Sequence, residues 1–173
     1  IQVIDFGGND ELRDKLHLLQ LTPGFEQVKS LLILRDGETN AQQAVRRIQS
    51  SLEKEGFPVP EGPGEWAGGK PKVGFLLFPC CDKSVIEGTL EDLCLSILKG
   101  EEYPDVLKEI SGFLDHLHDV RGRSFRHEFK TKLHTYFSVT DDLVGLKIGE
   151  AAKVGAFDWS SERLTYLKEF LLS

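Results

Sequence analysis

The sequence predicts an α/β fold with a mainly parallel sheet, and two observations lead to this prediction. Two predicted strands, 28–34 and 73–78, contain continuous apolar runs, at 31–34 in the first and over the whole of the second, and such runs have the composition of strands buried on both faces. Segments with helical periodicity alternate with these runs, which is typical of β–α units and of parallel strand pairing. A chain of 173 residues is long enough to bury a sizeable hydrophobic core.

The first part of the chain is predicted to run strand, helix, strand, helix, loop and strand. Residues 1–6 alternate apolar and polar positions, which favours a strand. The helix that follows is broken at 22–24, where Thr-Pro-Gly precedes the first apolar run. A second helix begins after Glu38, with Asn40 or its neighbour Thr39 as the N-cap. A loop rich in glycine and proline, 56–71, leads to the second apolar run.

The remainder of the chain is predicted to be helical. Thr89 is a good N-cap for a short helix, and Pro104 suits the first turn of a longer one. We therefore predict an α/β domain over 1–100 and an α-helical extension over 101–173 that packs on it.

The composition and charge of the chain indicate where the protein is located and which partners it can bind. The formal net charge of −7 argues against indiscriminate binding of nucleic acid, although it leaves room for a local basic patch. The sequence contains no signal peptide and no run that could span a membrane, so we expect no membrane partner. Three cysteines without zinc-site spacing, Cys80, Cys81 and Cys94, are expected to be reduced thiols in a cytoplasmic protein.

The first candidate site follows the first apolar run, where the sequence reads Asp36-Gly37-Glu38. Parallel strands deliver the residues after their carboxyl ends to the edge of the sheet where α/β proteins bind ligands. Two carboxylates separated by a glycine have the oxygen donors to share one hard cation, Mg²⁺ or Mn²⁺. The alternative is a strand-to-helix junction in which Asp36 makes a turn hydrogen bond and Glu38 is solvated.

A second acidic pair, Glu91-Asp92, opens a helix that is otherwise apolar. These residues are further candidates for metal ligands. The structural alternative is that acidic residues favour the first turn of a helix because of its dipole.

The basic residues of the chain gather on a helix near 125–137. Its flank and the residues before it supply candidate contacts to a phosphate backbone, namely Arg123, Arg126, Lys130, Lys132 and His134. A solvated helix face that pairs with acidic neighbours explains the same pattern equally well.

Several motifs together resemble the Toprim-like proteins, and more closely an uncharacterised archaeal and bacterial family within that group. They are the strand followed by Gly-Gly and a helix, the strand ending in Asp-x-Glu, and the sequence GTLED at 88–92. The ending KLHTYFSV … GLKIGEAA … FDW … LKEFL completes the likeness, which covers essentially the whole chain.

The resemblance implies a three-layer α/β/α domain, related to OLD-type nucleases, topoisomerases and primases. Their shared chemistry is Mg²⁺-dependent making or breaking of phosphodiesters. Carried over to this sequence, Asp36 and Glu38 match the family's two-acid motif, and Gly8 is a candidate for the glycine of the turn between. Glu91 and Asp92 are candidates for a further acidic position, as in OLD-type nucleases.

The sequence departs from that pattern in two ways. Its second acid is Glu38 where the family has aspartate, and no segment matches the family's first strand with its glutamate, so that Ile1 falls at the family's second strand. Two functions are therefore expected. The first is a metal-dependent nuclease or related phosphotransfer enzyme acting on nucleic acid. The second is a Toprim-like binding or assembly module without catalysis, and a homo-oligomer is compatible with both.

Overall fold

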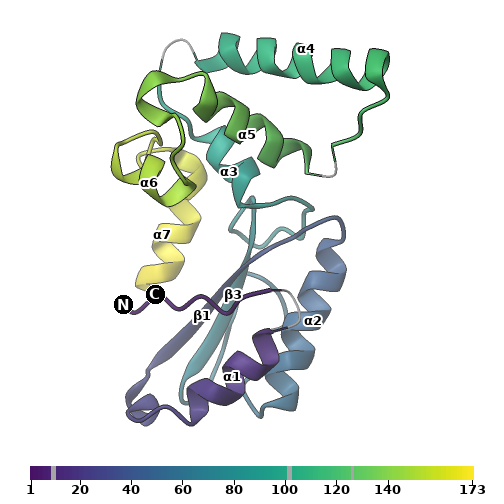
Figure 1. Cartoon of the computed structure of the whole chain (residues 1–173). Coiled ribbons are helices and arrows are strands. Elements are labelled where there is room, and N and C mark those ends of the chain that lie inside the picture. The colour runs from purple at the N-terminus through teal and green to yellow at the C-terminus, as the bar shows by residue number, and fades with distance from the viewer. Residues whose placement is uncertain (9–10, 101–102, 126) are drawn as a thin grey trace. The chain divides into compact units, whose positions relative to one another are not determined.

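The computed structural model describes residues 1–8, 11–100, 103–125 and 127–173. The fold is a mixture of helices and a small three-stranded sheet, so the predicted α/β class is confirmed (Figure 1). The chain divides into two compact units. The first, called the sheet unit, contains 1–88 and 166–173, and the second, called the helical unit, contains 89–165. This division differs from the predicted boundary after residue 100.

The sheet has the order β1-β3-β2 and is mixed. β1 (Ser30–Asp36) and β3 (Lys72–Phe78) pair in parallel, from Ser30 opposite Lys72 to Asp36 opposite Phe78. β2 (Trp66–Ala67) adds two antiparallel pairs on the other side of β3. The two apolar runs thus form the two long strands, as their composition predicts. The short β2 lies in the segment 56–71, which the sequence predicts to be a loop. The segment is so rich in glycine and proline that its sequence shows no alternating pattern typical of a strand.

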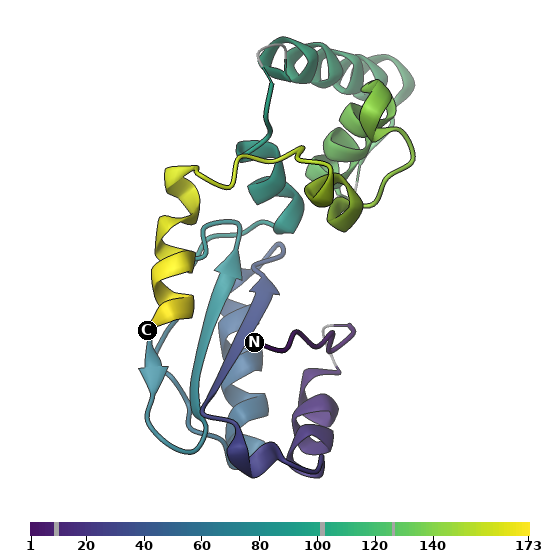
Figure 2. The same ribbon diagram turned by 90° about the vertical axis from the view of Figure 1, so that its left-hand side faces the viewer.

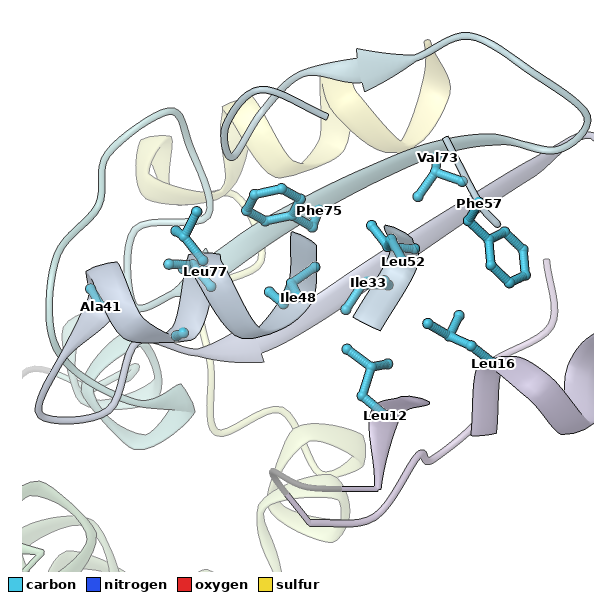
Figure 3. Close-up of a cluster of buried hydrophobic side chains, with 12 residues drawn as sticks. Leu12, Leu16, Ile33, Ala41, Ile48, Leu52, Phe57, Val73, Phe75 and Leu77 are labelled. Carbon is cyan, nitrogen blue, oxygen red and sulfur yellow. The ribbon is translucent and has the colours of Figure 1, made fainter. Parts of the chain in front are cut away.

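One face of the sheet is covered by α1 (Leu12–Gln20) and α2 (Ala41–Lys54), whose apolar residues recur at helical spacing. These residues and alternate residues of both strands form one buried cluster (Figure 3). Asn40 caps α2 by accepting a hydrogen bond from the backbone N–H of Gln43 at 2.9 Å. The cluster contains Leu12, Leu16, Ile33, Ala41, Ala44, Val45, Ile48, Leu52, Phe57, Val73, Phe75 and Leu77.

The two helices of this face are also joined at their surface. Glu55, just after α2, accepts a hydrogen bond from Arg13 at 2.8 Å and contacts the ring of His17 at 3.0 Å. The Arg13 hydrogen bond is the main reason why the pKa of Glu55 lies below its usual value.

The opposite face of the sheet is covered by α7 (Thr165–Leu172), from the far end of the chain (Figure 2). The ring of Phe170 stacks on Trp66, with centroids 4.7 Å apart. Both rings lie against Gly74 of β3, where a Cβ atom would come within 2.9 Å of each. The hydroxyl of Tyr166 donates a hydrogen bond to the carbonyl oxygen of Gly64 at 3.0 Å. Gly74 therefore lets the α7 rings approach the strand closely.

The predicted strand over residues 1–6 is wrong for this structure. The segment has no regular secondary structure, and Ile1 and Val3 are almost fully exposed. Only Phe6 packs against the buried cluster. An alternating pattern makes a segment suitable for a sheet, but a strand forms only where a neighbouring strand supplies its hydrogen-bond partners.

The helical unit is built around α5 (Glu128–Ser138). α3 (Leu90–Ser96) and α4 (Tyr103–Arg121) pack on it, and α6 (Ile148–Lys153) follows it along the chain. The unit's largest fully buried aromatic residues are Phe137 and Phe157, whose rings meet at a centroid distance of 6.4 Å. Among the described residues, the remaining elements are three short 3-10 helices, η1 (Phe25–Gln27), η2 (Asp141–Leu143) and η3 (Glu162–Leu164). In the described ranges, no helix has the length and apolar character needed to cross a membrane.

Candidate functional site

The turn after β1 holds Asp36 and Glu38 at the carboxyl end of the parallel strand pair. Asp36 is the last residue of β1 and lies opposite Phe78. The backbone N–H of Gly37 continues the ladder by donating to the carbonyl oxygen of Phe78 at 3.1 Å. Both acidic residues are half-buried. The structure thus places the two acids at the edge of the sheet that the sequence predicts.

Glycine is required between the two acids. A Cβ atom on Gly37 would overlap the carbonyl oxygen of Ile86 and would lie 3.1 Å from that of Phe78. Both atoms belong to backbone, which cannot rotate away as the end of a side chain can. The buried Gly37 therefore lets the turn lie directly against the segment that follows β3.

Glu38 is fixed from the same side. Its backbone N–H donates to the carbonyl oxygen of Gly88 at 2.8 Å, and the N–H of Gly88 returns a hydrogen bond at 2.9 Å. The φ angle of Glu38 is 54°, in the left-handed region that residues other than glycine rarely occupy. Such backbone conformations persist only where the surroundings enforce them, and they gather at functional sites. The turn is consequently a rigid platform for both carboxylates.

A buried thiol adjoins the platform. Cys81, after β3, is fully buried and also has a positive φ angle, 53°. Burial is the main cause that raises the pKa of its thiol to about 12, and the negative charges of Cys80, Asp82 and Asp36 contribute to the same rise. Cys81 is therefore protonated at neutral pH and is a neutral neighbour of Asp36.

Native alkylation should discriminate between the adjacent cysteines. The thiolate is the reactive form, and a pKa raised from 9.0 to about 12 makes it roughly 1,000-fold scarcer at pH 8. Cys80 is half-buried, whereas Cys81 and Cys94 are buried. We expect Cys80→Ser to remove iodoacetamide labelling of the folded protein and Cys81→Ser to leave it, as measured by intact mass. Rapid labelling of the folded Cys80→Ser variant would show that Cys81 is accessible.

The donor set after β1 suits a hard cation. Mg²⁺ is commonly bound by one or two carboxylates, with water and substrate phosphate completing the octahedron. Asp36 and Glu38 supply two such carboxylates on a rigid turn. Among the residues whose positions are described, no three His, Cys, Asp or Glu side chains gather as a metal-binding group. The residues thus fit a two-carboxylate site of the magnesium type and not a closed protein cage.

The second acidic pair belongs to the helical unit, and both of its residues have structural partners. The carboxylate of Asp92 accepts hydrogen bonds from the backbone N–H of Thr89 at 2.7 Å and from its hydroxyl at 3.0 Å. Glu91 lies 3.8 Å from the ammonium group of Lys130. Asp92 thus caps α3, and Glu91 joins α3 to α5, in agreement with the structural alternative for this pair.

The candidate nucleic-acid contacts are only partly gathered on α5. Lys132 forms a 2.7 Å ion pair with Glu128, one turn earlier, and its side chain is only 19% exposed. Lys130 pairs with Glu91, while His134 is exposed and its ring meets Phe137 edge-on. Arg123 is exposed, and Arg126 lies outside the described residues. Both lysines therefore have carboxylate partners that phosphate would have to displace.

Gly8 lies in a bend before α1, and its carbonyl oxygen accepts a hydrogen bond from the N–H of Glu11 at 3.1 Å. The residue before it, Gly7, has a φ angle of 82° and donates its N–H to Asp5 at 2.8 Å. The Gly-Gly pair thus forms the turn that leads into α1.

A cavity that no motif of the sequence predicts lies beside Glu38. It measures about 160 Å³ and is lined by Arg35, Glu38, Thr39, Asn40, Gln43, Ala44 and Arg47. Arg35 belongs to β1 and is only 5% exposed. An arginine that directly follows the apolar run and precedes the acidic turn was the available signal for this feature.

A family model matches the whole chain. The match spans residues 1–173, and the family is described as a protein of unknown function, DUF3226. No curated protein and no solved structure matches the chain.

Proposed function

The chain belongs to the DUF3226 family, and we propose that it is a Toprim-like protein that binds Mg²⁺ or Mn²⁺ at Asp36 and Glu38 and acts on nucleic acid by phosphodiester hydrolysis. One observation carries the proposal. Both carboxylates lie at the carboxyl end of a parallel strand, on a turn whose backbone is fixed by Phe78 and Gly88. A cation bound there would neutralise phosphate charge and polarise the scissile bond.

The chain's own residues supply the rigidity that such a site needs. Metal ligands must be held close to the geometry that the cation demands, and ligands on rigid elements meet this demand better than ligands on mobile loops. Gly37 packs against the backbone of Ile86, and Glu38 exchanges two hydrogen bonds with Gly88. Asp36 ends a strand that is paired along its whole length with β3.

A titration of Mn²⁺ by calorimetry tests the metal site. We expect saturable binding to the wild-type protein and a loss of about 100-fold or more in affinity for Asp36→Asn. Substitution of a residue that only hydrogen-bonds to a metal ligand typically lowers the metal affinity 10- to about 100-fold. The loss of a ligand itself should therefore lower the affinity by at least as much. Asp14→Asn is the matched control, because Asp14 is an exposed residue of α1 in the same unit. Equal binding by both variants would contradict the proposed ligands.

The same variants test the activity. The protein is incubated with Mn²⁺ and single-stranded DNA, double-stranded DNA or structured RNA. Cleavage that disappears with Asp36→Asn and persists with Asp14→Asn supports hydrolysis at this site. Cleavage that survives Asp36→Asn would remove the turn after β1 from the mechanism.

A second function, a Toprim-like binding or assembly module without catalysis, is favoured by a different observation. The further acidic candidates serve the helical unit itself, since Asp92 caps α3 and Glu91 pairs with Lys130. Saturable Mn²⁺ binding without cleavage of any of the three nucleic acids would favour this module.

A further inference from the structure

The helix α4 of the helical unit exposes part of its apolar surface. α4 packs on α5, and Ile110 and Leu114 are its buried residues (Figure 1). Val106, Phe113 and Val120 form a row beside these buried positions. Val106 is half-buried, but Phe113 is 55% exposed and Val120 is 60% exposed. This row, called here the α4 stripe, therefore leaves two large apolar side chains in solvent.

The spacing of the α4 stripe is the spacing of contacts between helices. Two turns of an α-helix contain about 7.2 residues, so residues seven apart face almost the same direction. The stripe extends over about 21 Å at a rise of about 1.5 Å per residue. Scattered apolar residues on a surface need no explanation, whereas a straight row with heptad spacing is typical of a helix that packs against another helix.

Two polar residues flank the α4 stripe on one side. Glu109 lies four residues before Phe113 and His116 lies three residues after it, so both project from the same side of the row. Both residues are exposed. An imidazole donates a hydrogen bond to a carboxylate in either protonation state, and it adds a positive charge when protonated. The stripe thus has an acceptor before its midpoint and a donor after it.

We propose that the α4 stripe binds a second copy of this chain, with the two α4 helices antiparallel about a two-fold axis at Phe113. In this register Val106 lies opposite the partner's Val120, and Phe113 lies opposite the partner's Phe113. Glu109 then comes within one residue of the partner's His116, and the two-fold axis forms this pair twice. The same surface on both copies is therefore complementary to itself, as an interface of this symmetry requires.

The charges of α4 favour the antiparallel arrangement. A parallel pair would place Glu109 against the partner's Glu109. The first turn of α4 carries Asp105, and its last turn carries His118 and Arg121. Antiparallel helices bring the acidic turn of one copy to the level of the basic turn of the other, and they oppose the two helix dipoles. The contact requires neither a metal nor nucleic acid, so the inference goes beyond the proposed function.

Sedimentation equilibrium of the full chain over a range of concentrations tests the proposal. We expect a dimer with a dissociation constant on the order of 100 µM, since one helix per copy forms a smaller interface than those of tight complexes. Phe113→Glu and Val120→Glu should each weaken the dimer about tenfold or more, because each places a carboxylate in the apolar contact. Val154→Glu is the matched control, since Val154 is 61% exposed in the same unit but lies outside α4. All three positions are exposed, so circular dichroism should show unchanged folding.

Charge reversal tests the register. Glu109→Lys and His116→Glu should each weaken the dimer, because each places like charges opposite one another. The double variant should recover much of the wild-type affinity, since Lys at 109 then faces Glu at 116 of the other copy. A wild-type protein that stays monomeric at all concentrations would overturn the proposal. Equal weakening by Val154→Glu and Phe113→Glu, or a double variant weaker than both single variants, would do the same.

Discussion

Gly37→Ala is expected to lower the free energy of unfolding of the sheet unit by about 3 kcal/mol, near the upper end for overpacking at a buried position. The added methyl group would overlap the carbonyl oxygen of Ile86 and crowd that of Phe78. Relief requires the turn to move away from the segment after β3. The same movement should reduce the affinity for Mn²⁺, because Asp36 and Glu38 flank the glycine.

Urea unfolding followed by tryptophan fluorescence measures this effect. Trp66 belongs to the sheet unit and Trp159 to the helical unit, so a Trp159→Phe background makes the signal specific for the sheet unit. Gly62→Ala is the control, because a Cβ atom at Gly62 meets nothing within 4 Å. A Gly37→Ala protein as stable as the Gly62→Ala protein would show that the turn is not held against the carbonyl of Ile86.

Phe75→Ala is expected to cost still more, about 3–5 kcal/mol, as is usual for a large aromatic residue removed from a core. Phe75 is fully buried at the centre of β3 and lies in the cluster beneath α1 and α2 (Figure 3). Its removal takes away apolar contacts and leaves a cavity between the strand and the helices. The sheet unit should then unfold at a clearly lower urea concentration.

The matched control is Phe113→Ala on α4, where the ring is 55% exposed. Substitutions at such surface positions usually change stability by less than about 0.5 kcal/mol. Comparable losses for the two variants would contradict the central place of Phe75 in the core. Because Phe75 lies three residues before Phe78, the partner of Asp36, and does not contact the turn's backbone in the described hydrogen bonds, a partly destabilised but folded variant should bind Mn²⁺ like the wild type.

The two predicted variants separate stability from function at the proposed site. Gly37→Ala should affect both the stability and the Mn²⁺ affinity, since the residue supports the turn directly. Phe75→Ala should affect the stability alone. A Mn²⁺ affinity that follows stability in both variants would place the ligands elsewhere in the sheet unit.

The sequence by itself determined the local elements of this protein. The apolar runs became β1 and β3: β3 is buried on both faces, as a continuous apolar run predicts, while β1, at the edge of the sheet, alternates buried and half-buried residues. Asn40 caps α2, and Gly56 follows that helix with a φ angle of 71°. These features depend on residues close in sequence, whose preferences are readable without a fold. The position of Asp36 and Glu38 at the end of a strand is likewise predictable from nearby residues. Their role as metal ligands stays a prediction.

Only the tertiary structure decided how distant segments combine. It left residues 1–6 without strand pairing in spite of their pattern, and it joined α7 to the sheet through Phe170 and Gly74. It also brought Arg35 and Arg47 to one cavity, although they belong to different elements. Pairing, stacking and shared cavities arise between residues that the chain brings together only on folding. The energy of each such contact depends on both segments, so the sequence pattern of one segment alone cannot predict the contact.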